Sequence, residues 1–467
     1  MRVKSFPVFD DQKKLSVFCL CVLSIGLMLA ADALAQNPSP YPNAATDRAL
    51  HSKTAMAPPS ANVPFTDPDF GSSMVRATDE TTDYIHTGGY LMTQGSGQQN
   101  EWSADTGKFW VAGQGGRVFA FAFDAPTLKI HSLPLAPAGK GLLVPLRLGA
   151  TFSFTDPDLI YGTTSPSPLT ISSYRFSTGK STAVIDTTTC GTQPALDPKG
   201  RSDDDVGVSL NSARFSISEG GQQQGAHQFV VVYDKKLGCR WYNTETGQVG
   251  GAWGPTGTAI GPTIPYLVRH AYISKSGKYV RIMNNGQGFY VWDIATLKVS
   301  PCGHKSGLEC FGYGVTGYNS YVNASAVVEY MQMVKRPLGN LAAMSQLYLP
   351  FDDPHEFEIT LHFSWSNVDV HDSTPVCASS YQYEGEPDIT EPFEGEIFCA
   401  ETDGKASTIW RFAHNRANWK APYFNTQPLG GISMDGKFFL FTSGWDQQLG
   451  LSSDGRPRTD VWIVKLD

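Results

Sequence analysis

The side chains best suited to chemistry in this sequence are three histidines, an arginine and two aromatic residues: His270, His362, His414, Arg416, Trp419 and Tyr423. Neutral imidazole binds transition metals and histidine titrates near neutral pH, so the histidines suit metal binding or proton transfer. The arginine matches a carboxylate through two parallel hydrogen bonds, and the aromatic rings suit stacking on sugars. These residues predict a ligand site. The alternative is that the histidines only satisfy neighbouring polar groups in a narrow, wet channel.

A metal site would need several of the donors close together. The candidate ligands for a divalent metal are His270, His362, His414 and Gln427, and no cofactor is certain from the sequence. The run Asp203–Asp205 has no calcium-loop pattern around it and is more typical of a solvated turn. The sequence contains no G-x-S-x-G, H-E-x-x-H, P-loop or dinucleotide-binding pattern.

The elements that must position these side chains are short strands, because one hairpin pattern recurs along the chain. It combines an apolar residue, a serine, a turn that ends in Gly-Lys and then an aromatic residue. The clear copies span residues 102–109, 273–279 and 432–438. The glycine supplies the positive φ angle that a tight hairpin turn requires. Four-stranded antiparallel units repeated in this way are typical of a β-propeller.

The spacing of the hairpins predicts the number of blades. Ser103 and Ser274 are 171 residues apart, or three units of 57, and Ser274 and Ser433 are 159 apart, or three units of 53. Weaker copies of the hairpin pattern lie between these serines, at Ser153, Ser218, residues 312–318 and Ser366. We therefore expect an all-β, seven-bladed propeller with four-stranded antiparallel blades, with six or eight blades as alternatives. Residues 73–77 should add a strand to the last blade beside residues 461–466, which closes the ring and removes unpaired edges.

In a propeller the innermost strand of each blade lines the central channel. We take the position four residues before each hairpin serine as equivalent, which selects Gln99, Arg214, His270, His362 and Leu429. Around His362 apolar and polar residues alternate, as in a strand buried on one side. His414 and Arg416 should lie at the exit of the sixth blade, at the same rim as the strand entrances. The predicted ligand site is therefore at this rim.

The beginning of the chain predicts export. A basic start is followed by an apolar run over residues 15–31 and by Ala33-Leu34-Ala35, which together indicate a secretory signal peptide over residues 1–35. An uncleaved membrane anchor is the alternative. Residues 36–64 are rich in Pro, Ser and Ala and predict a flexible linker, and residues 65–467 predict a single propeller domain. We expect a secreted or periplasmic bacterial protein with no membrane span after cleavage.

Cysteine usage agrees with export. Six cysteines remain beyond the signal peptide, and none has the spacing of a zinc site. Six cysteines allow 15 connectivities. Pairing of cysteines that are neighbours in the sequence predicts Cys190–Cys239, Cys302–Cys310 and Cys377–Cys399.

Composition and charge exclude several classes of protein. Only 17% of the 467 residues are charged, whereas 41% are hydrophobic and 12% aromatic. This balance excludes a coiled coil and a wholly disordered chain. The net charge of −8 argues against nucleic acid or anionic lipid as a partner. We expect a monomer whose partner is an extracellular glycan or an envelope protein.

The hairpins and their outer turns resemble the TolB/WD40-like propellers of exported bacterial proteins. The last two blades resemble oligogalacturonate lyase-type propellers, through residues 412–416, Trp419, Gln427-Pro428 and Phe441-Thr442-Ser443. In the lyases the last blade contributes a metal-binding histidine near this position. Residues 426–431 contain no histidine here, so a metal site of that kind would have to use Gln427.

Three functions follow as hypotheses. The first is an exported binding or scaffold propeller with a rim site for an extracellular glycan. The second is a metal-assisted polysaccharide lyase that acts on uronates, in which His414 or His362 would bind the metal and Arg416 would neutralise the substrate carboxylate. The third is a structural protein-interaction module of the cell envelope.

Overall fold

The computed structural model describes most of the chain beyond the predicted signal peptide, which lies outside the described residues. The described ranges are residues 39–94, 98–164, 167, 169–193, 195–196, 205–219, 229–257, 261–264, 268–283, 289–302, 314–327, 330–347, 359–366, 368–382, 389, 391–403, 408–418 and 422–467. Residues 44–466 form one compact unit by their contacts. Within the described ranges, no helix has the length and apolar character needed to cross a bilayer.

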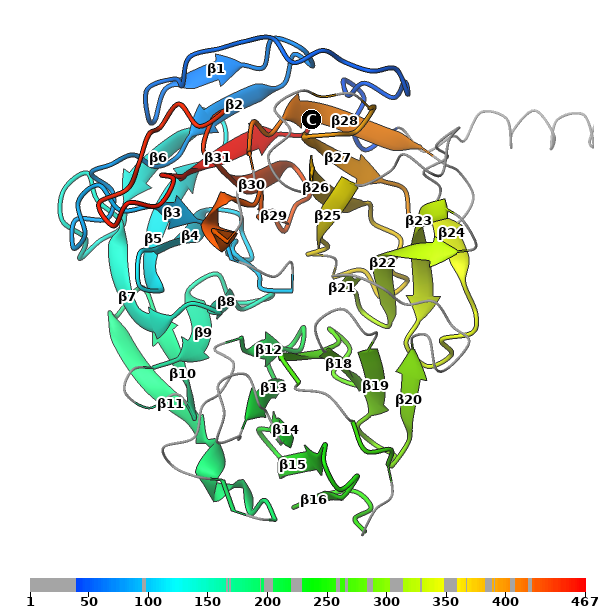
Figure 1. Cartoon of the computed structure of the whole chain (residues 1–467). Coiled ribbons are helices and arrows are strands. Elements are labelled where there is room, and N and C mark those ends of the chain that lie inside the picture. The colour runs from blue at the N-terminus through cyan, green and yellow to red at the C-terminus, as the bar shows by residue number, and fades with distance from the viewer. Residues whose placement is uncertain are drawn as a thin grey trace, which may run out of the picture. The chain divides into compact units, whose positions relative to one another are not determined.

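The described strands form seven antiparallel sheets arranged around a central axis, so the protein is a seven-bladed β-propeller (Figure 1). The predicted fold class and blade number are therefore confirmed. In blades 1 to 6 the first strand in the sequence lies nearest the axis and later strands lie further out, and in blade 7 the innermost strand is β29. The seventh blade also takes strands from the beginning of the chain.

The first three blades follow one another along the chain. Blade 1 contains β3 (Leu91–Met92), β4 (Lys108–Gly113), β5 (Arg117–Asp124) and β6 (Lys129–Ser132), with β7 (Leu142–Arg147) also paired to β5. Blade 2 contains β8 (Thr151–Phe152), β9 (Leu159–Thr163), β10 (Thr170–Arg175) and β11 (Lys180–Asp186), and a short 3-10 helix, η1 (Thr187–Cys190), follows it. Blade 3 contains β12 (Gly207–Val208), β13 (Arg214–Glu219), β14 (Phe229–Asp234), β15 (Gly238–Asn243) and β16 (Val249–Gly251).

The next three blades have four strands each. Blade 4 contains β17 (His270–Ile273), β18 (Tyr279–Met283), β19 (Phe289–Asp293) and β20 (Val299–Cys302). Blade 5 contains β21 (Val315–Thr316), β22 (Ser320–Val327), β23 (Tyr330–Pro337) and β24 (Ser345–Leu347). Blade 6 contains β25 (Ile359–Ser364), β26 (Val376–Gln382), β27 (Glu396–Ala400) and β28 (Ile409–His414), and the 3-10 helix η3 (Phe424–Thr426) follows it.

Blade 7 joins the two ends of the propeller. It contains β29 (Gly430–Ile432), β30 (Phe438–Ser443) and β31 (Asp460–Lys465), followed outward by β2 (Ser73–Arg76) and β1 (Pro64–Thr66). The antiparallel register of β2 on β31 places Met74 opposite Val464 and Arg76 opposite Trp462. The predicted ring closure by residues 73–77 is therefore confirmed.

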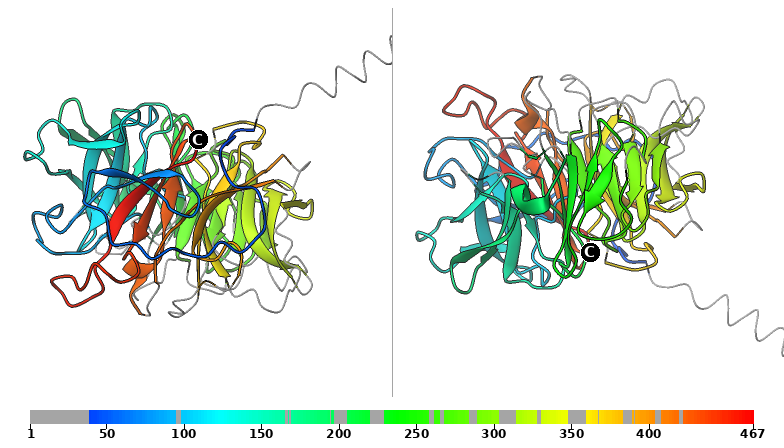
Figure 2. Two further views of the ribbon diagram at one scale, coloured as in Figure 1. Left: turned by 90° about the horizontal axis from the view of Figure 1, so that it is seen from above. Right: turned by 90° about the horizontal axis from the view of Figure 1, so that it is seen from below.

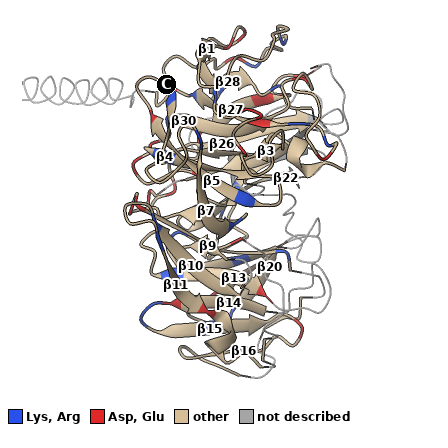
Figure 3. Ribbon diagram, turned by 90° about the vertical axis from the view of Figure 1, so that its left-hand side faces the viewer, with Lys and Arg blue, Asp and Glu red and all other residues tan. Residues whose placement is uncertain are grey.

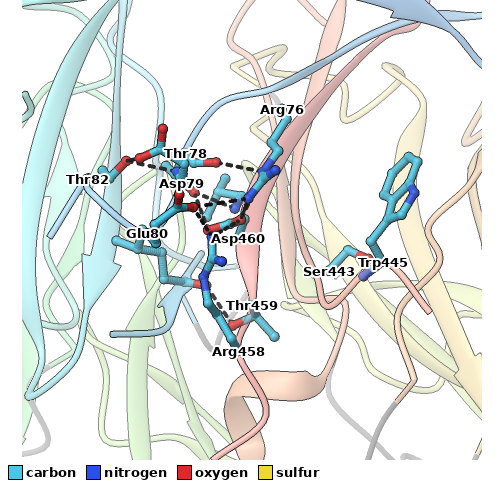
Figure 4. A network of polar contacts seen from close by, with 12 residues as sticks. Arg76, Thr78, Asp79, Glu80, Thr82, Ser443, Trp445, Arg458, Thr459 and Asp460 are labelled. Carbon is cyan, nitrogen blue, oxygen red and sulfur yellow. Dashed lines mark hydrogen bonds and ion pairs between the residues drawn. The ribbon is translucent and has the colours of Figure 1, made fainter. Parts of the chain in front are cut away.

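A buried ion pair accompanies the strand pairing in blade 7. Asp460 begins β31, is fully buried, and accepts hydrogen bonds from Arg76 at 2.5 and 2.9 Å and from Arg458 at 2.8 Å. Figure 4 shows both guanidinium groups directed at this carboxylate. Because a buried carboxylate is costly unless it is paired, this contact favours the closed ring over a separated N-terminal strand.

The core lies between neighbouring blades and is rich in aromatic side chains. At the junction of blades 7 and 1, the ring of Trp102 lies 5.4 Å from Phe123 and 6.3 Å from Phe438, centroid to centroid. Alternation along the strands directs apolar side chains into these interfaces. Charged residues are sparse along the strands (Figure 3). The blades are therefore held together by apolar packing, as the composition predicts.

The segment before β1 crosses the outer side of blades 6 and 7 (Figure 2). The backbone N–H of Arg411 on β28 donates to the carbonyl of Ala45, and the ammonium of Lys53 lies 2.6 Å from Asp446. The indole N–H of Trp445 donates to the carbonyl of Met56. These contacts hold part of the segment 36–64, the predicted linker, against the last two blades.

Two of the three predicted disulfides are present. Cys190 is bonded to Cys239, and Cys377 to Cys399 across the paired strands β26 and β27. Cys302 is also disulfide-bonded, but its predicted partner, Cys310, lies outside the described residues. Disulfides are typical of proteins that fold in an oxidising compartment, which fits an extracellular or periplasmic location.

The ring-closing ion pair gives a stability prediction. Asp460→Asn removes the charge shared by Arg76 and Arg458, so the free energy of unfolding should fall by about 3 kcal/mol, since buried arginines lose their counterion. Asp156→Asn is the matched control, because Asp156 pairs with Arg175 in solvent and its loss should cost less than about 0.5 kcal/mol. Urea unfolding measures both changes. Equal, small losses would contradict a stabilising role for Asp460.

Candidate functional site

Polar side chains from three blades meet at Asp205, immediately before the inner strand β12 of blade 3. Its Oδ1 accepts a 2.7 Å hydrogen bond from the side-chain amide of Gln94, which follows the inner strand β3 of blade 1. Its Oδ2 accepts a 2.7 Å hydrogen bond from the hydroxyl of Tyr272 and lies 2.9 Å from Nδ1 of His270. We call Gln94, Asp205, His270 and Tyr272 the Asp205 cluster. The cluster links blades 1, 3 and 4 near the axis.

The strand β17 explains why two of the partners face the same carboxylate. Side chains two residues apart in a strand point to the same side, so His270 and Tyr272 lie together. Their rings stack with centroids 5.3 Å apart and an interplanar angle of 14°. Asp205 is buried, whereas the His270 side chain is 19% exposed. The carboxylate therefore orients an imidazole that solvent still reaches.

The connection between β3 and β4 reaches across the axis. The side chain of Gln98 donates to the carbonyl of Gly314 at 3.1 Å and accepts from the N–H of Thr316 at 3.2 Å, both at the inner strand of blade 5. Figure 1 shows the described part of this connection near the centre of the ring. It therefore places polar groups of blade 1 opposite blades 3 and 5.

Several polar atoms in this connection are buried with no hydrogen-bond partner among the described residues. They are both amide atoms of Gln99, Oε1 of Gln94, Nδ2 of Asn100, Oε2 of Glu101 and Oγ1 of Thr106. Gln99 is only 2% exposed, and Glu101 only 1%. Buried polar atoms are almost always hydrogen-bonded in folded proteins, to protein, water or ligand. These atoms therefore indicate a place where a polar molecule completes the hydrogen bonding.

Glu101 is held against blade 7. Its Oε1 accepts a hydrogen bond from the backbone N–H of Gln94, and a side chain at position 431 would overlap its Oε2, so Gly431 leaves the necessary room. Burial raises the pKa of the Glu101 carboxyl to about 8, because the charged form loses its hydration. Glu101 is therefore predominantly neutral at pH 7.

Lys275 lies near the same axis, at the end where the inner strands turn into their hairpins. It directly follows the hairpin serine of blade 4 and is 7% exposed. Its ammonium donates to the carbonyls of Thr316 in blade 5 and Trp365 in blade 6, and lies 5.4 Å from the ring centroid of Phe154 after blade 2's inner strand. Burial lowers its pKa to about 8. Lys275 therefore fills the axis on the side away from the entrances of the inner strands.

His362 lies on β25, the inner strand of blade 6, as the alternation predicts. Its Nε2 lies 3.1 Å from the hydroxyl of Tyr381 and 3.2 Å from Oε1 of Gln427. Its ring stacks on Tyr381 with centroids 5.1 Å apart. Burial lowers the pKa of His362 to about 4, so the imidazole is neutral at pH 7. Two of the predicted metal donors, His362 and Gln427, thus lie together.

His414 and Arg416 lie elsewhere in the blade. His414 ends β28, which is the outermost strand of blade 6, and its Nε2 is 3.7 Å from Asp69 in the β1–β2 turn. Arg416 lies 3.2 Å from Asp446 and donates to the carbonyl of Thr54. Burial lowers the pKa of His414 to about 4. The structure therefore places both residues at the outer edge of blade 6 beside the N-terminal segment, which Arg416 holds through its hydrogen bond to Thr54.

Two predicted site residues remain, Trp419 and Tyr423, and neither is found in the Asp205 cluster or beside His362 in the described part of the chain. Trp419 lies outside the described residues, and Tyr423 is half-buried directly before η3. His270 contacts Asp205 and His362 contacts Tyr381 and Gln427, whereas neither ring nitrogen of the buried His414 has a hydrogen-bond partner among the described residues. The described residues contain no group of three or more His, Cys, Asp or Glu side chains that would hold a metal. His362 and Gln427 supply only two donors, so the described side chains do not fit the predicted metal site.

Two positions in blade 3 differ from the sequence analysis. Arg214 begins β13, the second strand, and Ser218 lies inside that strand, so neither lies on the inner strand β12 or in the turn that follows it. The hairpin serine of blade 3 is Ser209, whose N–H donates to the carbonyl of Arg214. Counting four residues back from Ser209 gives Asp205. The same spacing rule finds the central residue of the cluster once the correct serine is used.

Comparison with known proteins supports the fold. No protein-family model matches the chain, and no curated protein sequence matches it. An oligogalacturonate lyase from Vibrio parahaemolyticus has a similar structure, with 13% identity, a TM-score of 0.54, and coverage of 86% of this chain and 96% of that one. An oligogalacturonate lyase in complex with manganese gives 12% identity, a TM-score of 0.54, and coverage of 87% and 96%.

These likenesses define the class of protein. The chain is a propeller of the architecture seen in oligogalacturonate lyases, which agrees with that part of the predicted resemblance. No sequence-level match supports the TolB/WD40-like part. At such low identity the comparison shows the fold, and the chemistry must be argued from this chain's own side chains.

The burial of Glu101 gives a prediction for the pH dependence of stability. Its carboxyl pKa is raised from 4.5 to about 8, so the folded state binds more protons than the unfolded state between these values. The free energy of unfolding should fall as the pH rises through this window, by at most about 1.4 kcal/mol per pH unit. Glu101→Gln should remove this contribution, as measured by urea unfolding between pH values of about 5 and 8.5.

Glu219 provides an internal reference for this measurement. Burial also raises its carboxyl pKa to about 8, and it contributes the same slope to wild type and variant. The difference between the two proteins therefore isolates Glu101. Identical slopes would show that Glu101 is not buried in its neutral form.

Proposed function

We propose that this protein is an exported propeller that binds an extracellular glycan at the axis, through the Asp205 cluster and the β3–β4 connection. The observation that carries the proposal is the set of buried polar atoms of Gln94, Gln99 and Glu101 that lack partners among the described residues, next to a carboxylate shared by three blades. The disulfides support export.

Sugars fit this arrangement because a hydroxyl group both donates and accepts hydrogen bonds. The amide of Gln99 offers two donors and an acceptor, and Oε1 of Gln94 offers a further acceptor. The partly exposed imidazole of His270 is oriented by Asp205 and can bond a hydroxyl from solvent. Lys275 fills the axis on the side of the hairpin turns, so a ligand would approach from the entrances of the inner strands.

The site differs from the rim site expected around His362 and His414. His414 and Arg416 lie at the outer edge of blade 6 next to the N-terminal segment, where Arg416 donates to the carbonyl of Thr54. His362 remains on an inner strand, four residues before its hairpin serine, as His270 is before Ser274. We therefore assign the ligand to the inner strands.

A lyase activity is the second candidate. It is favoured by the contact of His362 with Gln427 and by the two similar structures, which are named as oligogalacturonate lyases, one of them with manganese. The described residues do not complete a metal site, so we derive no reaction step through a metal. A divalent metal stays a prediction for this chain.

The binding proposal predicts the effect of one substitution at the axis. His270→Ala should weaken binding of any glycan hit from an array by at least about tenfold, since it removes a hydrogen bond from an imidazole that Asp205 holds beside the ligand. His131→Ala is the matched control, because His131 is exposed on β6 at the outside of blade 1. Isothermal titration calorimetry with mature protein measures both. Equal affinities of the two variants, or no glycan hit at all, would reject the site.

The lyase candidate is tested separately. Mature protein supplied with manganese and polygalacturonate would release unsaturated sugar ends, which absorb ultraviolet light, if it were a lyase of this type. Under the binding proposal we expect no such product. A product that appears with wild type and disappears with His362→Ala would favour the lyase instead.

A further inference from the structure

We infer that a small monovalent anion, such as chloride, binds beside the guanidinium of Arg281, between blades 4 and 5. The inference concerns a second site in the molecule and does not depend on the glycan proposal. It rests on a buried positive charge whose N–H groups lack acceptors among the described residues. A charge that is taken out of water needs a partner of opposite charge, because its hydration is lost on folding.

The side chain of Arg281 is enclosed by aromatic rings from two blades. Arg281 lies on β18, is only 1% exposed, and pairs across the strands with Tyr272 on β17. Its guanidinium carbon lies 5.6 Å from the ring centroid of Tyr272, 5.9 Å from that of Phe289 and 4.7 Å from that of Tyr321. The ring faces attract a cation, but they carry no net charge that would neutralise it.

The hydrogen-bonding groups at this position are not satisfied by the described protein. Nε and Nη1 of Arg281 have no hydrogen-bond partner among the described residues, and neither has the hydroxyl of Tyr321. Burial raises the pKa of Tyr321 to about 12, so its hydroxyl stays neutral and cannot serve as the counterion. Burial lowers the pKa of Arg281, yet the guanidinium stays charged, because arginine keeps its proton in proteins.

Other buried arginines of this protein have the acceptors that Arg281 lacks. The guanidinium of Arg411 forms an ion pair with Glu396 at 2.6 Å. Arg240 is fully buried near tryptophan rings, as Arg281 is near tyrosines, and it donates to three backbone carbonyls at distances of 2.7, 3.1 and 3.4 Å. For Arg281 we assign the role of acceptor to a bound anion.

The charge and the donors at this position define the kind of anion. The site offers one positive charge, so a monovalent anion leaves the buried region neutral, whereas a divalent anion would leave a buried negative charge. The donors come from Arg281 on blade 4 and Tyr321 on blade 5. A spherical halide accepts hydrogen bonds from different directions, so chloride fits both requirements. The bound anion would link the two blades.

The test measures urea unfolding of the mature protein while chloride is replaced stepwise by gluconate at constant ionic strength. Gluconate is also monovalent, but it is too large for an enclosed site. For a single anion site, the unfolding equilibrium constant should fall about tenfold for each tenfold rise in chloride above its dissociation constant. Arg281→Gln should abolish this dependence. A wild-type protein whose stability is independent of chloride would overturn the inference.

Two further variants separate a bound anion from other effects. Arg240→Gln is the matched control, because it removes an equally buried guanidinium that has carbonyl acceptors, and it should retain the chloride dependence. Glu309 is the one acidic residue in the segment 303–313, which lies outside the described residues. A wild type without chloride dependence and a Glu309→Gln variant that acquires it would assign the counterion to this carboxylate and contradict the inference.

A second measurement locates the anion even if Arg281→Gln fails to fold. Bromide replaces chloride in halide sites and is identified by its anomalous X-ray scattering. In crystals of the wild-type protein grown with bromide, we expect an anomalous peak within hydrogen-bond distance of Arg281 and Tyr321. Bromide peaks that lie only elsewhere on the molecule would overturn the inference.

Discussion

The pairing of β2 with β31 is the interaction on which the rest of the structure depends, because it joins the beginning and the end of the propeller in one sheet. Without it, blades 7 and 1 would not be neighbours, and Glu101 would not rest on Gly431. The strand pairing is reinforced by Asp460, which is buried between Arg76 and Arg458. A buried carboxylate with two charged partners makes the open form costly. Closure thus sets the distances across the axis.

The closed ring separates two kinds of packing. Between blades the side chains are apolar and aromatic, and this burial provides most of the driving force for folding. At the axis the inner strands approach from all sides, and backbone and side-chain polar groups are concentrated there. Gln98 and Lys275 satisfy carbonyls of other blades across this space. Atoms of Gln94, Gln99 and Glu101 are among the buried polar atoms that lack a protein partner in the described structure, and the proposed ligand would complete their hydrogen bonding.

The likeness to oligogalacturonate lyases concerns the architecture, and the axis of this chain carries its own chemistry. A propeller brings side chains from distant parts of the sequence to a common centre whatever those side chains are. Here they include Asp205 and Glu101, and the buried guanidinium of Arg281 lies 5.6 Å from the ring of Tyr272 in the same cluster. The arginine expected to bind a carboxylate, Arg416, instead holds the N-terminal segment at the outer edge of blade 6. One fold can therefore present quite different charges at equivalent positions.

The sequence by itself determined the local features of this protein. Hairpin spacing predicted seven blades, residues 73–77 were identified as the closing strand, and Cys190–Cys239 and Cys377–Cys399 were paired correctly. The alternation around His362 also placed that residue on an inner strand. These features depend on turn chemistry and on the two-residue period of a strand, which are properties of short segments.

Only the tertiary structure decided which side chains meet. In blade 3 the sequence pattern pointed to Ser218 as the hairpin serine, whereas the structure shows that it is Ser209. Counting back four residues from the wrong serine selected Arg214 instead of Asp205. His414 was placed at the rim of the axis, whereas it ends the outermost strand of blade 6. Contacts such as that of Gln94 with Asp205 join residues far apart in the chain, and no local period encodes them. Their geometry arises when the ring closes and every inner strand faces the same axis.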